Sequence, residues 1–208
     1  MLNIAVFGSG KGSNFQAILT AIQKGSIPDA RVCLVISNNS SAGILEIARA
    51  NSIPALHLSR KRFLDEQSFV ETVLDALHAH RANFIALAGY MKRLDPRVIR
   101  EFHGRVINIH PALLPQFGGQ GMYGMHVHEA VIASGSRQSG ATVHLVDEEY
   151  DHGAIVLQKT VPVVEGDTPE TLAARVLAVE HAIYPEAVRL FAEGKSGVGK
   201  AETAVHHS

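Results

Sequence analysis

The sequence predicts one α/β domain of the Rossmann-like type, with a mostly parallel twisted sheet and helices on both of its faces. Short β-branched runs alternate with amphipathic helical patterns along most of the chain. The run RVCLVIS at 31–37 is apolar almost throughout, which is typical of a strand buried on both faces. The chain has 208 residues, 46% of them hydrophobic, and this suits a single domain with a sizeable core.

The first half of the chain alternates strands with helices. Its strands are expected at 3–8, 31–37, 53–58, 83–89 and 105–110. Its helices are expected at 13–25, 42–51, 65–81 and 95–104. In the first helix, the apolar residues Phe15, Ile18, Leu19 and Ile22 recur at helical spacing, so one face should be buried.

The second half follows a different pattern. Two strands are expected at 141–148 and 153–163, separated only by a short acidic segment. A long helix follows at 168–194, with a kink or break expected near Pro185. The globular domain is therefore expected to cover 1–194. The remainder, 195–208, lacks apolar periodicity and is expected to be a disordered tail.

Composition narrows the class of function. The formal net charge is -1, so no overall field favours nucleic acid or an anionic membrane. The N-terminus lacks the pattern of a secretory signal, and no apolar run approaches membrane-spanning length. The single cysteine, Cys33, lies in an apolar run and is expected to be a core residue. The expectation is a soluble cytoplasmic protein without metal that acts on small molecules, as a monomer or a homodimer.

The segment GSGKGSN at 8–14 connects the first strand to the first helix. Glycines allow a tight turn and close approach to a ligand, and a helix N-terminus attracts phosphate. Ser13 or Asn14 is expected to cap the helix. The spacing fits neither a Walker A loop nor the dinucleotide fingerprint. Phosphate binding and a purely structural turn both remain open from the residues alone.

The segment NIHPALLP at 108–115 ends the fifth strand. Asn108 and His110 are two residues apart, so they should share a face at the carboxyl end of that strand, where open α/β sheets bind ligands. An amide can donate to an oxyanion, and an imidazole can move protons near neutral pH. The alternative is a histidine satisfied within the fold.

Two further segments carry polar side chains. The acidic stretch DEEYDHG at 147–153 is either a solvated loop or the source of a carboxylate that orients His110 and raises its pKa. His126 and His128 have a spacing that could bind metal, but no nearby cysteine or carboxylate completes a recognisable set. No metal is therefore expected.

Together, the segments NIHPALLP, LAGYMKRL, DHGAIVLQKTVPV and EHAIYP resemble those of the formyltransferase family, in particular its glycinamide ribonucleotide formyltransferases. The resemblance extends from residue 3 to about residue 193. It implies transfer of the formyl group of 10-formyltetrahydrofolate, a cosubstrate, to the amine of glycinamide ribonucleotide in purine synthesis. The alternatives are a formyltetrahydrofolate deformylase-like hydrolase and a nucleotide-binding module without chemistry.

The same resemblance implies roles for particular residues. It makes Asn108, His110 and Asp151 the catalytic set, with Asn108 also lining the folate site. The implied glycinamide ribonucleotide site consists of Gly12, Ser13, Asn14 and Glu180. The implied folate wall consists of Met91, Lys92, Arg93 and Leu94. One of Arg60, Lys61 and Arg62 is expected to meet the folate tail, and GGQGMYGMH at 118–126 is expected to form a mobile loop over the site.

Overall fold

The computed structural model describes residues 1–197 and contains one seven-stranded sheet in the order β3-β2-β1-β4-β5-β6-β7. The strands are β1 (Leu2–Phe7), β2 (Ala30–Ser37), β3 (Ala55–His57), β4 (Phe84–Leu87), β5 (Val106–His110), β6 (Gln138–Leu145) and β7 (Ile155–Pro162). The helices are α1 (Ser13–Gln23), α2 (Gly43–Ala50), α3 (Glu66–Ala79), α4 (Pro96–Glu101), α5 (Met125–Ala133) and α6 (Pro169–Ala192), with a short 3-10 helix η1 (Arg60–Arg62).

The sheet has a parallel part and an antiparallel part. Strands β1 to β5 pair in parallel, whereas β6 runs antiparallel to β5 and β7 antiparallel to β6. The predicted fold class is therefore confirmed. Because β1, β4 and β5 are neighbouring parallel strands, their carboxyl ends lie at the same edge of the sheet. The antiparallel strand β6 pairs with β5 next to them.

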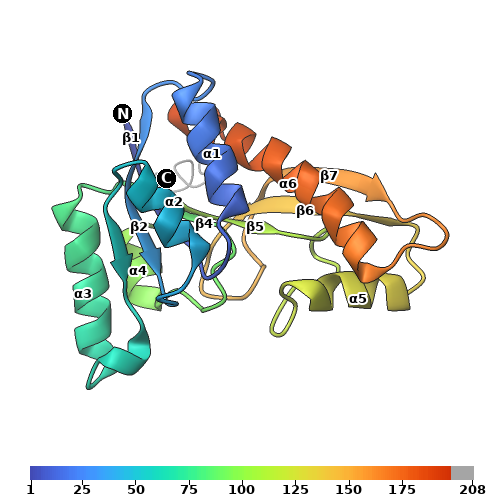
Figure 1. Cartoon of the computed structure of the whole chain (residues 1–208), viewed down its shortest axis with the longest axis horizontal. Helices are drawn as coiled ribbons and strands as arrows, with labels where there is room; N and C mark the ends of the chain where they lie inside the picture. The colour runs from blue at the N-terminus through green and yellow to red at the C-terminus, as the bar shows by residue number, and fades with distance from the viewer. Residues whose placement is uncertain (198–208) are drawn as a thin grey trace, which may run out of the picture.

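Helices cover both faces of the sheet because the inner strands are apolar on both sides. On β1, Ile4 and Val6 belong to one core cluster, while Ala5 and Phe7 belong to the other. Helices α1, α2 and α6 supply the first cluster, and α3 and α4 supply the second. Figure 1 shows α1 and α6 lying near each other above the middle of the sheet, and α3 at its far end.

Three sequence-based expectations were wrong. Helix α6 continues through Pro185, so the expected break is absent, while a kink there stays a prediction. Residues 125–126 of the expected loop are the first turn of α5. Gly12, not Ser13 or Asn14, is the N-cap of α1, and no side chain caps that helix.

One buried tyrosine connects the long helix to the middle of the sheet. Tyr184 on α6 is fully buried, and its hydroxyl donates to the carbonyl oxygens of Leu87 (2.8 Å) and Ile107 (3.3 Å). Glu180 lies one helical turn before Tyr184, so α6 brings that carboxyl group close to β4 and β5. Within residues 1–197, no helix has both the length and the apolar character that crossing a bilayer needs.

The extent of the domain, 1–194, and the disordered tail at 195–208 stay predictions. Most of that tail lies outside the described residues.

Candidate active site

A polar cluster lies at the carboxyl end of β5, as its sequence predicted. Asn108 and His110 share one face of the strand, and their partners on β6 are His144 and Thr142. The neighbouring Ile107 and Ile109 point to the opposite face and join the core under α6. Because side chains alternate between the two faces of a strand, Asn108 and His110 lie on one face, and Ile107 and Ile109 lie on the other.

His110 is buried, and both of its ring nitrogens face acceptors. Nε2 lies 2.8 Å from the carbonyl oxygen of Phe117, and Nδ1 lies 3.6 Å from Oδ2 of Asp151. Both oxygens can accept a hydrogen bond from a protonated ring nitrogen, so the surroundings of His110 accommodate its imidazolium form. Burial nevertheless lowers the pKa of His110 below its ordinary value, and the charge of Asp151 and the Phe117 bond only partly oppose this. The Asp151 carboxylate does raise the pKa of His110, as expected, but desolvation outweighs it, so the net shift is downward.

Asp151 joins the cluster from the loop between β6 and β7. The backbone N–H of Gly119 donates to Oδ2 of Asp151 at 2.9 Å, and Nε2 of His144 lies 3.5 Å from Oδ1. Burial raises the pKa of this carboxyl group, but the contacts with His144, His110 and Gly119 outweigh burial and leave the pKa below its ordinary value. Asp151 is therefore ionised near neutral pH.

The other carboxylates of the acidic stretch stay outside the cluster. Asp147 accepts from the backbone N–H of Glu149 and pairs with exposed His152, while Glu148 pairs with Arg100 at the surface. The stretch therefore divides: Asp151 contacts His110, whereas Asp147, Glu148 and Glu149 lie in a solvated loop. That Asp151 orients His110 for catalysis stays a prediction.

Two residues of the cluster were missed by the sequence analysis. His144 is buried on β6; its Nδ1 lies 2.7 Å from the Leu145 carbonyl oxygen, and its Nε2 lies 3.2 Å from Nδ2 of Asn108. Nε2 of His144 therefore lies within reach of both the Asn108 amide and the Asp151 carboxylate, and His144 links these two residues. Thr142 accepts from the backbone N–H of Leu114 and donates to the Ala112 carbonyl, so it holds the chain after His110. Polar residues at alternate positions of ATVHLV were the available signal.

The loop after β1 forms a second polar site with α6. Asn14 is buried in the first turn of α1, and its Nδ2 donates to Oε2 of Glu180 at 2.6 Å. Within residues 1–197, the buried Oδ1 of Asn14 has no hydrogen-bond partner. Burial raises the pKa of Glu180, and the bond from Asn14 opposes this only in part. The Asn14–Glu180 hydrogen bond therefore brings together two residues far apart in the chain at the start of α1. Their role in binding a nucleotide stays a prediction.

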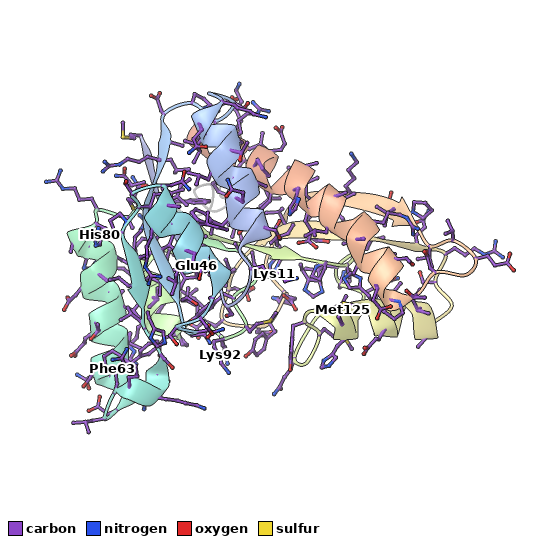
Figure 2. All side chains as sticks on the ribbon, viewed as in Figure 1. Lys11, Glu46, Phe63, His80, Lys92 and Met125 are labelled. Carbon is purple, nitrogen blue, oxygen red and sulfur yellow. The ribbon has the colours of Figure 1, made fainter. Side chains whose placement is uncertain are left out.

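The four residues of the implied folate wall do not form one surface. Leu94 is buried in the core, whereas Met91, Lys92 and Arg93 are exposed. The backbone N–H of Met91 donates to the hydroxyl of Ser9 at 2.8 Å, which ties this segment to the loop after β1. Figure 2 shows Lys11, Lys92 and Met125, which come from three separate segments, in the same part of the view.

The basic residues of η1 stay near their own segment. Arg60 donates to the Phe63 carbonyl oxygen, and Nη1 of Arg62 lies 3.3 Å from Nδ1 of His57. Neither contact reaches the polar cluster. Which of Arg60, Lys61 and Arg62 meets a folate tail stays a prediction.

The histidines of α5 do not form a metal site. Within residues 1–197, no group of three histidine, cysteine, aspartate or glutamate side chains could hold a metal ion. His128 is buried, its Nδ1 has no partner, and its pKa is lowered by burial and by the charge of His110. Helix α5, which the sequence analysis did not predict, brings His128 close to His110.

An open α/β sheet with an amide, an imidazole and a carboxylate at the carboxyl end of a central strand defines a Rossmann-like protein equipped for acid–base chemistry. The chain belongs to the formyl transferase family, which it matches over residues 2–188.

Relatives from plants and bacteria support this membership. The chain is 46% identical over 192 residues to a chloroplastic phosphoribosylglycinamide formyltransferase of Vigna unguiculata, covering 91% of this chain and 61% of the relative. It therefore spans about three fifths of that plant protein. It is 40% identical over 195 residues to the phosphoribosylglycinamide formyltransferase of Haemophilus influenzae, covering 94% of this chain and 89% of the relative.

Solved structures show the same fold. The crystal structure of glycinamide ribonucleotide transformylase 1 from Symbiobacterium toebii has a TM-score of 0.87 and 42% identity. The match covers 93% of this chain and 89% of that one.

Proposed function

We propose that this chain transfers the formyl group of 10-formyltetrahydrofolate to the amine of glycinamide ribonucleotide. The observation that carries the proposal is the cluster of Asn108, His110 and Asp151 at the carboxyl end of β5. It supplies an oxyanion donor, a proton carrier and an anion: Asp151 contacts His110 directly, and His144 lies between Asp151 and Asn108. The names of the relatives agree with this reaction.

The reaction is an attack of the substrate amine on the formyl carbon. A tetrahedral intermediate forms, with negative charge on the former carbonyl oxygen. The Asn108 amide and the His110 imidazolium donate to that oxygen, and Asp151 stabilises the imidazolium. Collapse of the intermediate breaks the bond to the folate nitrogen, which takes up the proton that the amine has lost.

The contacts of His110 indicate which of its protons is available. One ring nitrogen faces the Asp151 carboxylate, and the other faces the neutral carbonyl of Phe117. A hydrogen bond to a charged partner is the stronger of the two. A substrate oxyanion would therefore displace the Phe117 carbonyl and accept from Nε2.

The nucleotide is proposed to bind at the start of α1. Gly12, Ser13 and Asn14 present backbone N–H groups suited to a phosphate. The unpartnered Oδ1 of Asn14 and the carboxyl group of Glu180 are acceptors suited to the hydroxyl or amine groups of the substrate. A buried acceptor without a donor is unfavourable, and a bound substrate would satisfy it.

The folate is proposed to lie along the exposed residues 91–93 and Asn108; the side chain of Leu94 is buried in the core and is not available to it. Exposed Met91 and Tyr123 offer apolar surface near the cluster. The end of the Met91 side chain approaches Gly124, at the start of α5.

The deciding experiment mixes the protein with both substrates and follows the absorbance change as the folate loses its formyl group. We expect His110→Ala to lower kcat by about 10²–10⁴ and Asn108→Ala by about 10²–10³. We expect the double variant to lose less than the product of the two, because both groups serve one transition state.

Two results would reject the proposal. Rapid formate release without any amine would indicate a hydrolase of the deformylase type. Binding of both ligands without any turnover would indicate a module without chemistry. As a control, Glu180→Gln should raise KM for the nucleotide and leave KM for the folate nearly unchanged, because the two substrates occupy separate parts of the site.

A further inference from the structure

An exposed arginine connects the segment after β4 to the loop that carries Asp151. The Arg93 guanidinium donates through Nη2 to the carbonyl oxygen of Glu148. The same guanidinium lies over the ring of Tyr150, 5.6 Å from its centroid. Tyr150 immediately precedes Asp151, so both contacts fall within three residues of the carboxylate.

The rest of this loop is held at its base and through Asp147 and Asp151, which make the contacts described above. The backbone N–H of Leu145 donates to the Ala154 carbonyl at 2.9 Å, and Gly153 packs directly against Leu145. At the tip, Glu148 and Tyr150 are exposed. Asp151 itself has a φ of +54°, a conformation that favours glycine, so neighbouring contacts must hold it.

Arg93 makes the more directional of two links to this tip. Arg100 also pairs with Glu148, at 3.0 Å, but both side chains are more than half exposed, and such pairs contribute little. Arg93 instead combines a hydrogen bond to the backbone with a ring contact. A planar guanidinium can use its edge and its face together, whereas a lysine ammonium cannot.

We propose that Arg93 is a positioning residue, which holds the 148–150 segment so that Asp151 faces His110. This inference rests on the proposed function, because Arg93 affects catalysis only by positioning Asp151. The proposed role distinguishes Arg93 from its neighbour Lys92, which makes no contact with the 148–150 segment within residues 1–197. The Arg93 side chain acts on the protein itself, and its backbone remains available to line the folate site.

The contact can be observed without any substrate. The sequence contains no tryptophan, so Tyr150→Trp places a single indole at the tip and keeps an aromatic face for the guanidinium. Adding Arg93→Met to this variant should lower the steady-state anisotropy of the indole and raise its quenching by acrylamide. Unchanged anisotropy and quenching would overturn the contact.

The matched control is Arg105→Met in the same tryptophan variant. Arg105 makes equivalent contacts elsewhere, because it lies over the ring of Phe102 at 5.3 Å and donates to the Glu101 carbonyl at 2.8 Å. Its loss should leave the indole signal as it was. An equal change in both variants would show general loosening and would also overturn the proposal.

Kinetics then test the link to Asp151. In the otherwise unaltered protein, Arg93→Met should lower kcat about 3- to 10-fold and change KM for the folate less than about twofold, since the folate contacts remain. A loss confined to the folate KM would instead make Arg93 a ligand-binding residue and overturn the proposal.

A double variant separates this proposal from the proposed function. Combined with Asp151→Asn, Arg93→Met should cause little further loss, because both changes act on one carboxylate. A further loss as large as in the unaltered protein would overturn the inference. Full activity in Asp151→Asn would reject the catalytic set and the purpose assigned to Arg93, while the anisotropy comparison would still report the contact itself.

Discussion

Two glycine-rich loops border the proposed site, and they use glycine for different reasons. In the first loop, residues 8–14, Gly12 has a φ of +84°, and an added Cβ would lie only 2.8 Å from the Cα of Ile44. In the second loop, residues 117–124, Gly121 has a φ of +89°, but an added Cβ would meet nothing within 4 Å. At Gly12 the first loop is fixed by packed neighbours. The second loop is packed at Gly118, where an added Cβ would lie 2.5 Å from Cδ2 of Leu114, but it is open at Gly119 and Gly121.

The difference matches what each loop borders. The first loop leads into the Asn14–Glu180 pair, which joins α1 to α6 on one face of the sheet. The second loop supplies a carbonyl to His110 and an N–H to Asp151. A phosphate cradle benefits from rigidity, while a cover over a reacting centre must let Phe117 release His110. Although both loops are rich in glycine, the first therefore forms a fixed surface and the second forms one that can adjust.

The largest expected effect is on Gly12. Gly12→Ala should lower the free energy of unfolding by about 2–4 kcal/mol, because the left-handed conformation and the close approach to Ile44 both oppose a Cβ. Urea unfolding of the variant measures this. A loss below about 1 kcal/mol would show that the first loop can adjust and would remove the contrast between the loops.

A smaller effect is expected at Gly121. Gly121→Ala should lower the free energy of unfolding by about 1–2 kcal/mol, since only the backbone conformation opposes the side chain. The same urea titration applies. A loss equal to that of Gly12→Ala would mean that packing also constrains the second loop.

Acidification should affect the two regions in opposite directions. The pKa of Glu180 is raised by burial, so its region gains stability as pH falls and loses it as pH rises through the folded-state pKa. The pKa values of His110 and His128 are lowered by burial from the ordinary 6.5, so below about that pH the unfolded state binds more protons and their region loses stability.

Amide hydrogen exchange at about pH 7.5 and pH 5, corrected for intrinsic rates, measures this opposition. Protection in α1 should rise relative to protection in β5 and α5 on acidification. Glu180→Gln should abolish the gain in α1. A uniform change across the molecule would contradict the prediction.

The smallest effect is expected at Gly10. An added Cβ there meets nothing within 4 Å, and no left-handed φ is required. Gly10→Ala should change the free energy of unfolding by no more than about 0.5 kcal/mol in either direction. A loss above about 1 kcal/mol would show that the first loop needs every glycine.

Local patterns predicted the sheet and the polar pair, while contacts between distant segments escaped them. The alternation of strands and helices predicted the parallel part, and the period of two in NIHP placed Asn108 and His110 on one face. The position of α5 was missed because GGQGMYG precedes it and suggested an irregular loop throughout.

The missing partners are those that tertiary structure creates. His144 reaches Asn108 only because β6 pairs antiparallel with β5, and the Phe117 carbonyl reaches His110 only through the turn after it. Burial determines whether the pKa of His110 is raised or lowered, and burial cannot be read from the charged residues of the sequence. Asn14 and Glu180 were assigned from resemblance alone, because no periodicity relates residues so far apart.

The two outer strands of the sheet have a consequence for how the molecule meets its own copies. An open sheet exposes unpaired backbone groups along each edge, where another chain could add a strand. On one side, β3 has three residues, too few to guide a long pairing. On the other, β7 is longer, but it carries exposed Lys159 near its middle and Pro162 at its end. A charge and a residue without an N–H both discourage strand addition. The fold therefore resists edge-to-edge aggregation, although it does not close into a barrel.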